Sequence, residues 1–309
     1  IVWTDTLQTA FMLISVLLSI YLINTNLEWT FIEFINSVEI QDYNKIIVNE
    51  SFLERNHFIK SFIGGMFITI CMTGLDQDMM QKNLTCRSLK DAQKNMLVFS
   101  FVLVIVTFLF MLLGALLFIY AKKNNIEIPL INGVPNSDLL FPQIALNSDI
   151  GIVIGVTFLL GLIAAAYSSA DSALTSLTTS FCVDFLNLEN KSKKIQNSIR
   201  KKTHVVMSFV LIIIIIIFKN VLNTNVIDGL LTVAGYTYGP LLGLFAFGIF
   251  TNYKIKDQYV WIVALFSVLL VLGIGNIDSN YLGGYKIGYE LLPINGLITF
   301  IGLILIRRK

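Results

Sequence analysis

The chain has 309 residues, of which 55% are hydrophobic and only 14% are charged, and its mean hydropathy is +0.75. This composition excludes a water-soluble globular domain and predicts a protein that crosses a membrane several times. A net charge of +2 offers no strongly basic surface, so we expect no nucleic-acid partner.

Eight apolar segments are each about long enough for a transmembrane helix, which needs ~20 residues. They are 1–23, 58–81, 96–121, 150–182, 203–222, 226–251, 259–276 and 287–306. Most of the 22 Lys and Arg residues follow the second, fourth, sixth and eighth segments, so the positive-inside rule assigns these loops and both chain ends to the cytoplasm. We therefore predict an all-α membrane protein with about eight transmembrane helices, and short helices in the external loops 24–57 and 122–149.

The first segment carries Asp5 near its start, with Thr4, Gln8 and Thr9 around it. One interpretation is a capping residue, because an acidic side chain at a helix start is stabilised by the helix dipole. The other is an ion site, in which Asp5 lies beside polar residues of the fourth segment. Opposite charges ~4 Å apart gain about 4 kcal/mol at an effective dielectric constant of 20, which offsets much of the burial cost. The sequence leaves both interpretations open.

The second segment, SFIGGMFITICMTGL, contains Gly64, Gly65 and Gly74 and runs directly into the polar stretch DQDMMQKNL. One interpretation is a helix broken near Met72–Gly74, whose free backbone groups face a cavity. The other is close helix packing at the glycines, with the polar end emerging into water.

The fourth segment is the most informative, because it is apolar enough to cross a bilayer and yet carries a polar face. The residues of this face recur at steps of three and four; they are Ser168, Asp171, Ser172, Thr175 and Thr179. Hydroxyls in membrane helices often serve packing alone, but an aspartate near mid-membrane costs about 2.5–3.5 kcal/mol. Because carboxylate and hydroxyl oxygens are ligands for hard cations, this face predicts part of a sodium site.

The sixth segment, AGYTYGPLLGLFAFGIF, contains Pro240 and several glycines. Proline removes a backbone donor from a helix, so this position is either a hinge used during transport or a kink fixed by packing.

Other chemistries find little support in the sequence. His57 and His204 form no visible dyad with a carboxylate. Cys71, Cys86 and Cys182 have neither the spacing of a metal-binding motif nor a pattern that indicates disulfide bonds. No Walker-type glycine loop is present, which argues against an ATP-driven transporter. We expect no enzymatic activity, no cofactor and no metal other than sodium.

Three sequence motifs follow one another along the chain: VWTDTLQT, GLDQDMMQKNLTCRSLKDAQKNM and AAAYSSADSALTSLTTSFCVDF. With them the chain resembles the sodium:solute symporter family. The resemblance implies a five-plus-five inverted-repeat fold of the LeuT type, with alternating access around a midplane site. The segments would match core helices five to ten plus two C-terminal helices. Since the chain starts with Ile, we expect 1–309 to be a single transmembrane transporter domain that lacks its N-terminal helices and does not transport alone.

The resemblance also implies two sodium sites. The main site would use Ala165, Ser168 and Ser169, and a second site, present in some members, would use Asp5, Asp171 and Ser172.

For the solute, the resemblance implies a cavity lined by Thr73, Gln77 and Thr232. Sugar-transporting relatives often carry aromatic residues where this chain has Met72 and Thr73, which weakens the case for a stacked sugar ring. The implied activity is secondary active symport in the inner (plasma) membrane, driven by sodium as the coupling ion. The solute would be a sugar, a carboxylate, a sialic acid or an amino acid. The alternative is a sensor or receptor built on the same fold.

Overall fold

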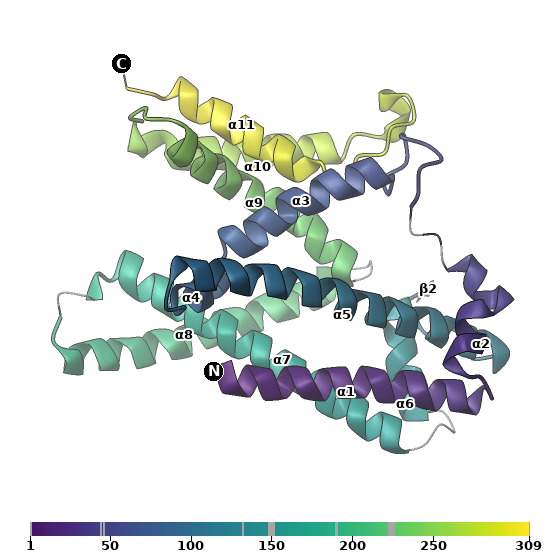
Figure 1. Cartoon of the computed structure of the whole chain (residues 1–309). Coiled ribbons are helices and arrows are strands. Elements are labelled where there is room, and N and C mark those ends of the chain that lie inside the picture. Colours follow the sequence, from purple (N-terminus) through teal and green to yellow (C-terminus); the bar gives the residue numbers. More distant parts are fainter. Residues whose placement is uncertain are drawn as a thin grey trace. The chain divides into compact units, whose positions relative to one another are not determined.

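The computed structural model describes residues 2–43, 45, 47–131, 133–147, 152–188, 191–221 and 226–308. The described chain is mostly helical (Figure 1) and divides into two compact units. The first unit comprises Ile1–Asn44 and Gln81–Asn225, and the second comprises Lys45–Met80 and Val226–Lys309. Each unit is described by itself below.

The first unit is built from long helices with short elements between them. In chain order these are α1 (Val2–Asn26), α2 (Phe31–Asn36), η1 (Val38–Asp42), α5 (Leu89–Lys123), β1 (Leu130–Ile131), β2 (Val134–Pro135), η2 (Ser137–Leu139), α6 (Leu140–Asn147), α7 (Ile152–Ser180), the π-helical turn η3 (Phe181–Phe185) and α8 (Lys193–Val221). The predicted short helices in both external loops are thus present. The two-residue strands form an antiparallel pair that the all-α prediction did not include.

The second unit contains α3 (Phe58–Gly74), α9 (Val226–Phe250), η5 (Asp257–Tyr259), α10 (Val260–Gly275), η6 (Ser279–Leu282) and α11 (Leu291–Leu305). The short helix α4 (Gln77–Leu84) contains the point where the chain passes from the second unit to the first.

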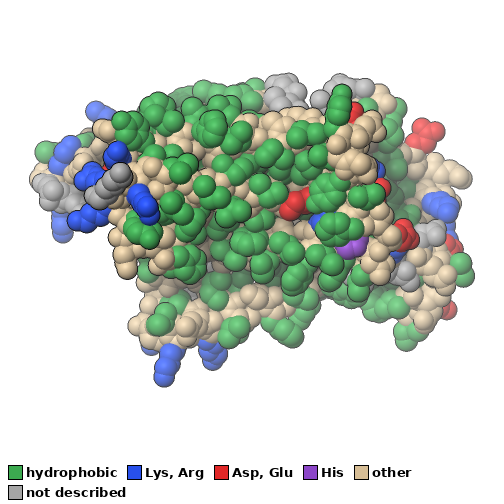
Figure 2. All heavy atoms as spheres, turned by 90° about the horizontal axis from the view of Figure 1, so that it is seen from above, with side chains coloured by type: hydrophobic (Ala, Val, Ile, Leu, Met, Phe, Trp, Pro, Cys, Tyr) green, Lys and Arg blue, Asp and Glu red, His purple; other side chains and the backbone are tan. Residues whose placement is uncertain are grey.

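Six described helices are long and apolar enough to cross a membrane, and two of the eight predicted segments form shorter apolar helices. The six spans are Thr6–Asn26, Leu89–Lys123, Gly155–Phe185, Lys193–Lys219, Val226–Phe250 and Asp257–Gly275. The shorter helices are α3 and α11, with 17 and 15 residues. Hydrophobic side chains cover much of the face shown in Figure 2, as expected for a surface that meets lipid or other apolar helices.

Two helices begin earlier than predicted. α5 starts at Leu89 because Ser88 caps it, with its hydroxyl accepting a hydrogen bond from the Asp91 amide. α5 therefore has 35 residues, or about 52 Å at 1.5 Å per residue. α8 starts at Lys193, because much of the basic loop consists of Lys, Arg and Gln, which are good helix formers.

The first unit is held together by an apolar core that includes Ile23, Phe34, Leu116 and Ile144. Its helices α1 and α7 run antiparallel along one another (Figure 1). They approach closely at Gly161, where a β-carbon would lie 3.2 Å from Cβ of Ser15. A side chain at 161 would therefore require Ser15 to shift by a few tenths of an ångström.

The second unit is centred on α9 and α11, which interlock through glycines. A β-carbon at Gly239 would lie 2.3 Å from Cβ of Asn295, and one at Gly243 would lie 2.5 Å from the carbonyl oxygen of Gly296. Small residues let helix backbones approach in this way in membrane proteins.

Pro240 lies inside α9, and a neighbouring helix replaces the hydrogen bond that it removes. Proline has no N–H, so the carbonyl four residues earlier, that of Tyr236, loses its helical donor. Nδ2 of Asn295, a fully buried residue of α11, donates to this carbonyl at 2.8 Å. The structure favours a kink fixed by packing over a free hinge at this position.

The second predicted segment is interrupted, as one of the two interpretations requires. α3 ends at Gly74, where the Leu75 amide still donates to the carbonyl of Cys71, and α4 begins only at Gln77. Packing explains one of its glycines, because a β-carbon at Gly64 would lie 2.4 Å from Cβ of Tyr289. Packing thus accounts for Gly64, and the interpretation that backbone groups freed at the break face a cavity stays a prediction.

Candidate functional site

The buried face of α7 becomes polar toward the C-terminal end of the helix. Going along the helix, Phe158, Gly161 and Ala164 are buried, and they are followed by buried Ser172 and Ser176. Steps of three, four and eight between these positions, with half-buried Ser168 in the middle of the longest one, keep them on one face. The predicted polar face is thus present, but its most buried hydroxyls are those of Ser172 and Ser176, and Ser176 was missed by the sequence analysis.

The hydroxyls of Ser172 and Ser176 have no hydrogen-bond partner among the described residues. Serines in membrane helices usually donate to the carbonyl one turn earlier, as Ser19 of α1 does to the Ser15 carbonyl at 2.7 Å. A buried hydroxyl without such a bond costs free energy unless another group satisfies it. These two oxygens are therefore available to a ligand that the protein binds from outside.

The structure places the residues of the predicted main sodium site near this face. Ala165 and Ser168 are half-buried, whereas Ser169 is exposed in the described part of the chain. Asp171 is half-buried beside Ser172.

The first turns of α1 approach the same level of α7. Because α1 and α7 are antiparallel and touch at Gly161 and Met12–Ser15, a rise of 1.5 Å per residue puts Gln8 about level with Ser168. Oε1 of Gln8 is buried and has no hydrogen-bond partner among the described residues. The backbone of Asp5 belongs to α1, but its side chain lies outside the described residues.

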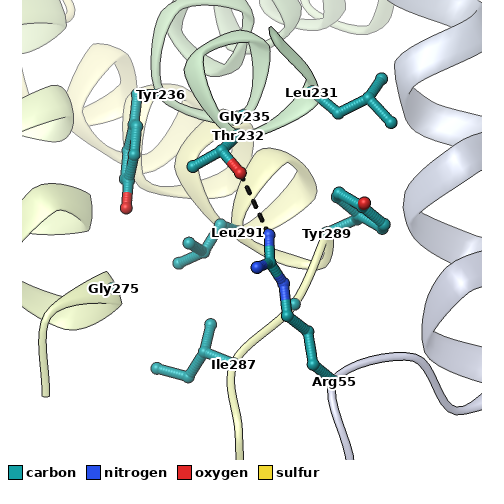
Figure 3. A pocket seen from close by; sticks show the side chains of 10 residues that line it. Arg55, Leu231, Thr232, Gly235, Tyr236, Gly275, Ile287, Tyr289 and Leu291 are labelled. Carbon is teal, nitrogen blue, oxygen red and sulfur yellow. Dashed lines mark hydrogen bonds between the residues drawn. The ribbon is translucent and has the colours of Figure 1, made fainter. Parts of the chain in front are cut away.

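A cavity of about 130 Å³ lies within the second unit and contains one of the predicted solute residues, Thr232. Figure 3 shows Arg55 reaching into it beside Thr232, with Tyr236 and Tyr289 on either side. Further lining comes from Leu231, Gly235, Gly275, Ile287, Gly288 and Leu291. Thr73, which is half-buried, and Gln77, which is exposed, are not among the residues described as lining this cavity.

Arg55 is held by Asp228 at the start of α9. Nη2 of Arg55 lies 3.1 Å from Oδ1 of Asp228 and donates to the Thr232 hydroxyl at 3.0 Å. The Tyr289 hydroxyl donates to Oδ1 of Asp228 at 2.9 Å. The protonated phenol of Tyr289 thus acts as a donor to this carboxylate.

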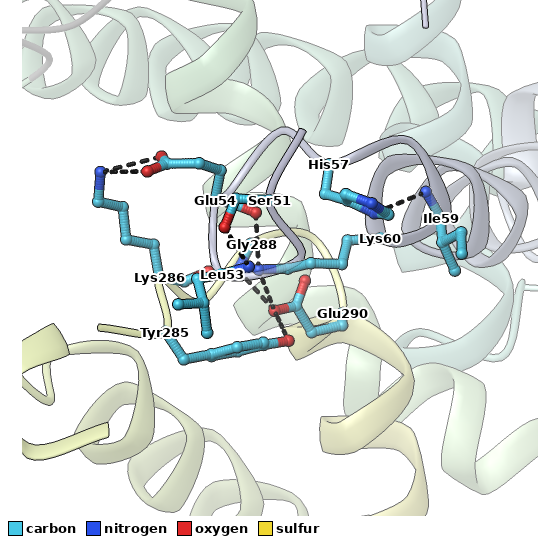
Figure 4. Close-up of polar contacts among 10 residues, drawn as sticks. All are labelled: Ser51, Leu53, Glu54, His57, Ile59, Lys60, Tyr285, Lys286, Gly288 and Glu290. Atoms are coloured by element: carbon cyan, nitrogen blue, oxygen red, sulfur yellow. Dashed lines mark hydrogen bonds and ion pairs between the residues drawn. The ribbon is translucent and has the colours of Figure 1, made fainter. Parts of the chain in front are cut away.

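A second polar network lies close by in the same unit and ties the loop before α3 to the loop before α11 (Figure 4). Lys60 is only 3% exposed, and its Nζ lies 3.7 Å from Oε1 of Glu290. The ammonium also donates to the carbonyls of Glu54 and Lys286 and lies 3.9 Å from the centre of the Tyr285 ring. The residues thus enclose one buried cation with oxygens and an aromatic face.

The Tyr285 hydroxyl donates to Oε1 of Glu290 at 2.9 Å. Burial and this hydrogen bond raise the pKa of Tyr285 to about 12.

Apart from Thr232, the sequence analysis assigned no role to the residues of these two networks. Asp228 carried a usable signal, since it opens an apolar segment much as Asp5 does. Arg55 and Lys60 carried none, because their partners Asp228 and Glu290 lie more than 170 residues further along the chain.

Apolar helices of membrane-spanning length and a helix pair with buried free hydroxyls together define a multi-pass α-helical membrane protein. The chain belongs to the sodium:solute symporter family, which matches residues 1–257 and confirms the predicted resemblance.

The chain is 26% identical over 246 residues to the sodium/sialic acid symporter SiaT of Proteus mirabilis (strain HI4320). The alignment covers 77% of this chain and 48% of that protein, so the chain spans about half the length of this relative.

Proposed function

We propose that this chain forms the ion-binding part of a secondary active transporter that couples inward sodium flux to the uptake of a small organic solute. Family membership supports this proposal, as does the relative named as a sodium/sialic acid symporter. The observation that carries it is the pair of buried, unpartnered hydroxyls on α7, Ser172 and Ser176.

The proposed sodium ligands are oxygens of α7 and α1. Ala165, Ser168 and Ser169 form this chain's contribution to the main site, through backbone carbonyls and hydroxyls. Asp5, Asp171 and Ser172 form the second site, and the position of Ser176 one turn further adds a neutral oxygen to it. Hard oxygen ligands of this kind suit an alkali cation, which here is a transported substrate rather than a cofactor.

The proposed coupling follows from the charge of the ion. Each sodium that moves inward across ~100 mV supplies about 2.3 kcal/mol from voltage alone. By linkage, solute and sodium raise each other's affinity when both favour the same conformation. A second ion would double the voltage term, so the state of the Asp5 and Asp171 site decides how steeply the solute can be concentrated.

The proposed setting is the inner (plasma) membrane, with both ends of the chain in the cytoplasm. We propose that α3 and α11 also cross the membrane, which would give eight transmembrane helices in one transporter domain of the inverted-repeat type.

Sodium-driven uptake into vesicles that contain the full-length protein tests the proposal. Ser168→Ala/Ser169→Ala should abolish the stimulation by sodium, and Ser172→Ala should change the number of sodium ions per solute. Ser208→Ala is the matched control, because its hydroxyl already donates to the His204 carbonyl at 2.9 Å. Unchanged sodium activation in the double variant would contradict the ion site.

A further inference from the structure

The cavity beside Arg55 is lined by one charged side chain among the described residues. Among the described residues that line it, Arg55 carries the only charge, whereas Asp228 contacts the guanidinium but is not part of the lining. The other described lining groups are the hydroxyl-bearing residues Thr232, Tyr236 and Tyr289, three aliphatic side chains and glycines. A molecule in this cavity therefore meets one cationic group, several hydroxyls and an apolar wall.

Some N–H groups of the Arg55 guanidinium have no acceptor among the described residues. It carries five N–H groups, and its described contacts are Nη1 to Oδ2 of Asp228 at 3.3 Å, Nη2 to Oδ1 of Asp228 at 3.1 Å and Nη2 to Thr232 at 3.0 Å. No other described residue accepts the remaining N–H groups. In Figure 3 the guanidinium points toward the Thr232 hydroxyl, with Tyr236 on one side of the cavity and Tyr289 on the other.

The chemistry of these groups selects a carboxylate with a single charge. The N–H groups of Arg55 that Asp228 and Thr232 leave unused can donate charge-assisted hydrogen bonds to the oxygens of a further carboxylate. The charge of Arg55 is already partly balanced by Asp228, which disfavours a dianion such as phosphate. The aliphatic side chains of Leu231, Ile287 and Leu291 suit the carbon chain of an organic acid.

We propose that this cavity is a docking subsite for the carboxylate of an acidic organic solute, held by Arg55 at the end of the second unit that the sequence places outside the membrane. The inference rests on the proposed function, because it makes the carboxylate group part of the transported solute. It narrows the solute class to organic monoacids and adds Arg55 as a binding residue.

Binding of propionate and of its uncharged isostere propionamide to the purified protein, followed by ligand-observed NMR, tests the subsite directly. Propionate should bind and propionamide should bind at least tenfold more weakly. Arg55→Gln should weaken propionate binding at least tenfold. Gly235→Val should do the same by filling the cavity, because a β-carbon at this buried lining position would meet no atom within 4 Å.

Asp228→Asn is the matched control. It removes the competing negative charge but leaves the guanidinium in place, so propionate should bind as tightly as before or more tightly. If the role of Arg55 is only to pair with Asp228, then Asp228→Asn and Arg55→Gln will weaken binding equally, and the subsite is refuted. Equal binding of propionamide and propionate, or propionate binding that Gly235→Val leaves unchanged, refutes it as well.

Sodium-driven uptake separates this inference from the proposed function. If no sodium gradient drives uptake but Arg55-dependent propionate binding persists, the transport proposal fails and the carboxylate site stands. If uptake is sodium-driven but propionate binding fails the tests above, the subsite fails and the transport proposal stands.

Discussion

The buried ion pair of Lys60 and Glu290 gives the sharpest prediction for stability. Lys60→Met leaves the Glu290 carboxylate, whose side chain is 16% exposed, without the ammonium that lies 3.7 Å away. Removing one member of a buried pair destabilises a protein by about 3–5 kcal/mol. The substitution also removes the cation–π contact between the Lys60 ammonium and the Tyr285 ring, which contributes about 1 kcal/mol. We therefore expect the free energy of unfolding to fall by at least 3 kcal/mol, where ~3 is the lower end of this range.

Unfolding of the purified protein in detergent micelles, followed by circular dichroism, measures this loss. The double variant Lys60→Met/Glu290→Met should recover most of it, because no buried charge is then left unpaired. Lys286→Met is the control: its pair with Glu54 at 2.9 Å is about half exposed, and such pairs contribute about 1 kcal/mol or less. Equal losses in Lys60→Met and Lys286→Met, or a double variant that loses the sum of its two single variants, would refute the reasoning.

Two further predictions concern packing and pH. Gly239→Ala should destabilise by about 1–3 kcal/mol, since its β-carbon would overlap Asn295; Gly235→Ala, which meets open space, should be neutral or stabilising in the same unfolding assay. For Tyr285 the folded-state pKa of about 12 exceeds the ordinary value of 10.0, so the folded state holds this proton more tightly. Its contribution to stability is therefore complete below pH ~10 and is lost as the pH rises toward ~12; Tyr285→Phe should remove this part of the alkaline loss, and an unchanged pH profile would contradict the assignment.

The sequence predicted the helical class and most helix positions, because hydrophobic length and the polar face of α7 are local properties. It also named Ser172 as a candidate ligand, and its hydroxyl is buried without a hydrogen-bond partner among the described residues; its role as a ligand stays a prediction. It did not single out Ser176, because one more serine at helical spacing is common in membrane helices.

Contacts between residues far apart in the chain could not be predicted from the sequence. Asn295 looks like an isolated polar residue in an apolar segment, and its role appears only when α11 packs against the Tyr236 carbonyl that Pro240 leaves free. The sequence likewise left the choice between hinge and fixed kink open, since the deciding donor lies on another helix. The sodium ligands Ala165, Ser168, Ser169, Asp5 and Asp171 stay predictions.

The length of α5 has a consequence for how the protein meets its surroundings. A rod of about 52 Å is much longer than the ~30 Å thickness of lipid hydrocarbon. Tilting accommodates only part of the excess. The first turns after Ser88, which carry Lys90, Asp91 and Lys94, must therefore stand in water as a charged stalk. This stalk is rigid because it continues a transmembrane helix. A molecule that binds it from the aqueous phase would therefore shift or tilt the membrane-embedded part of α5.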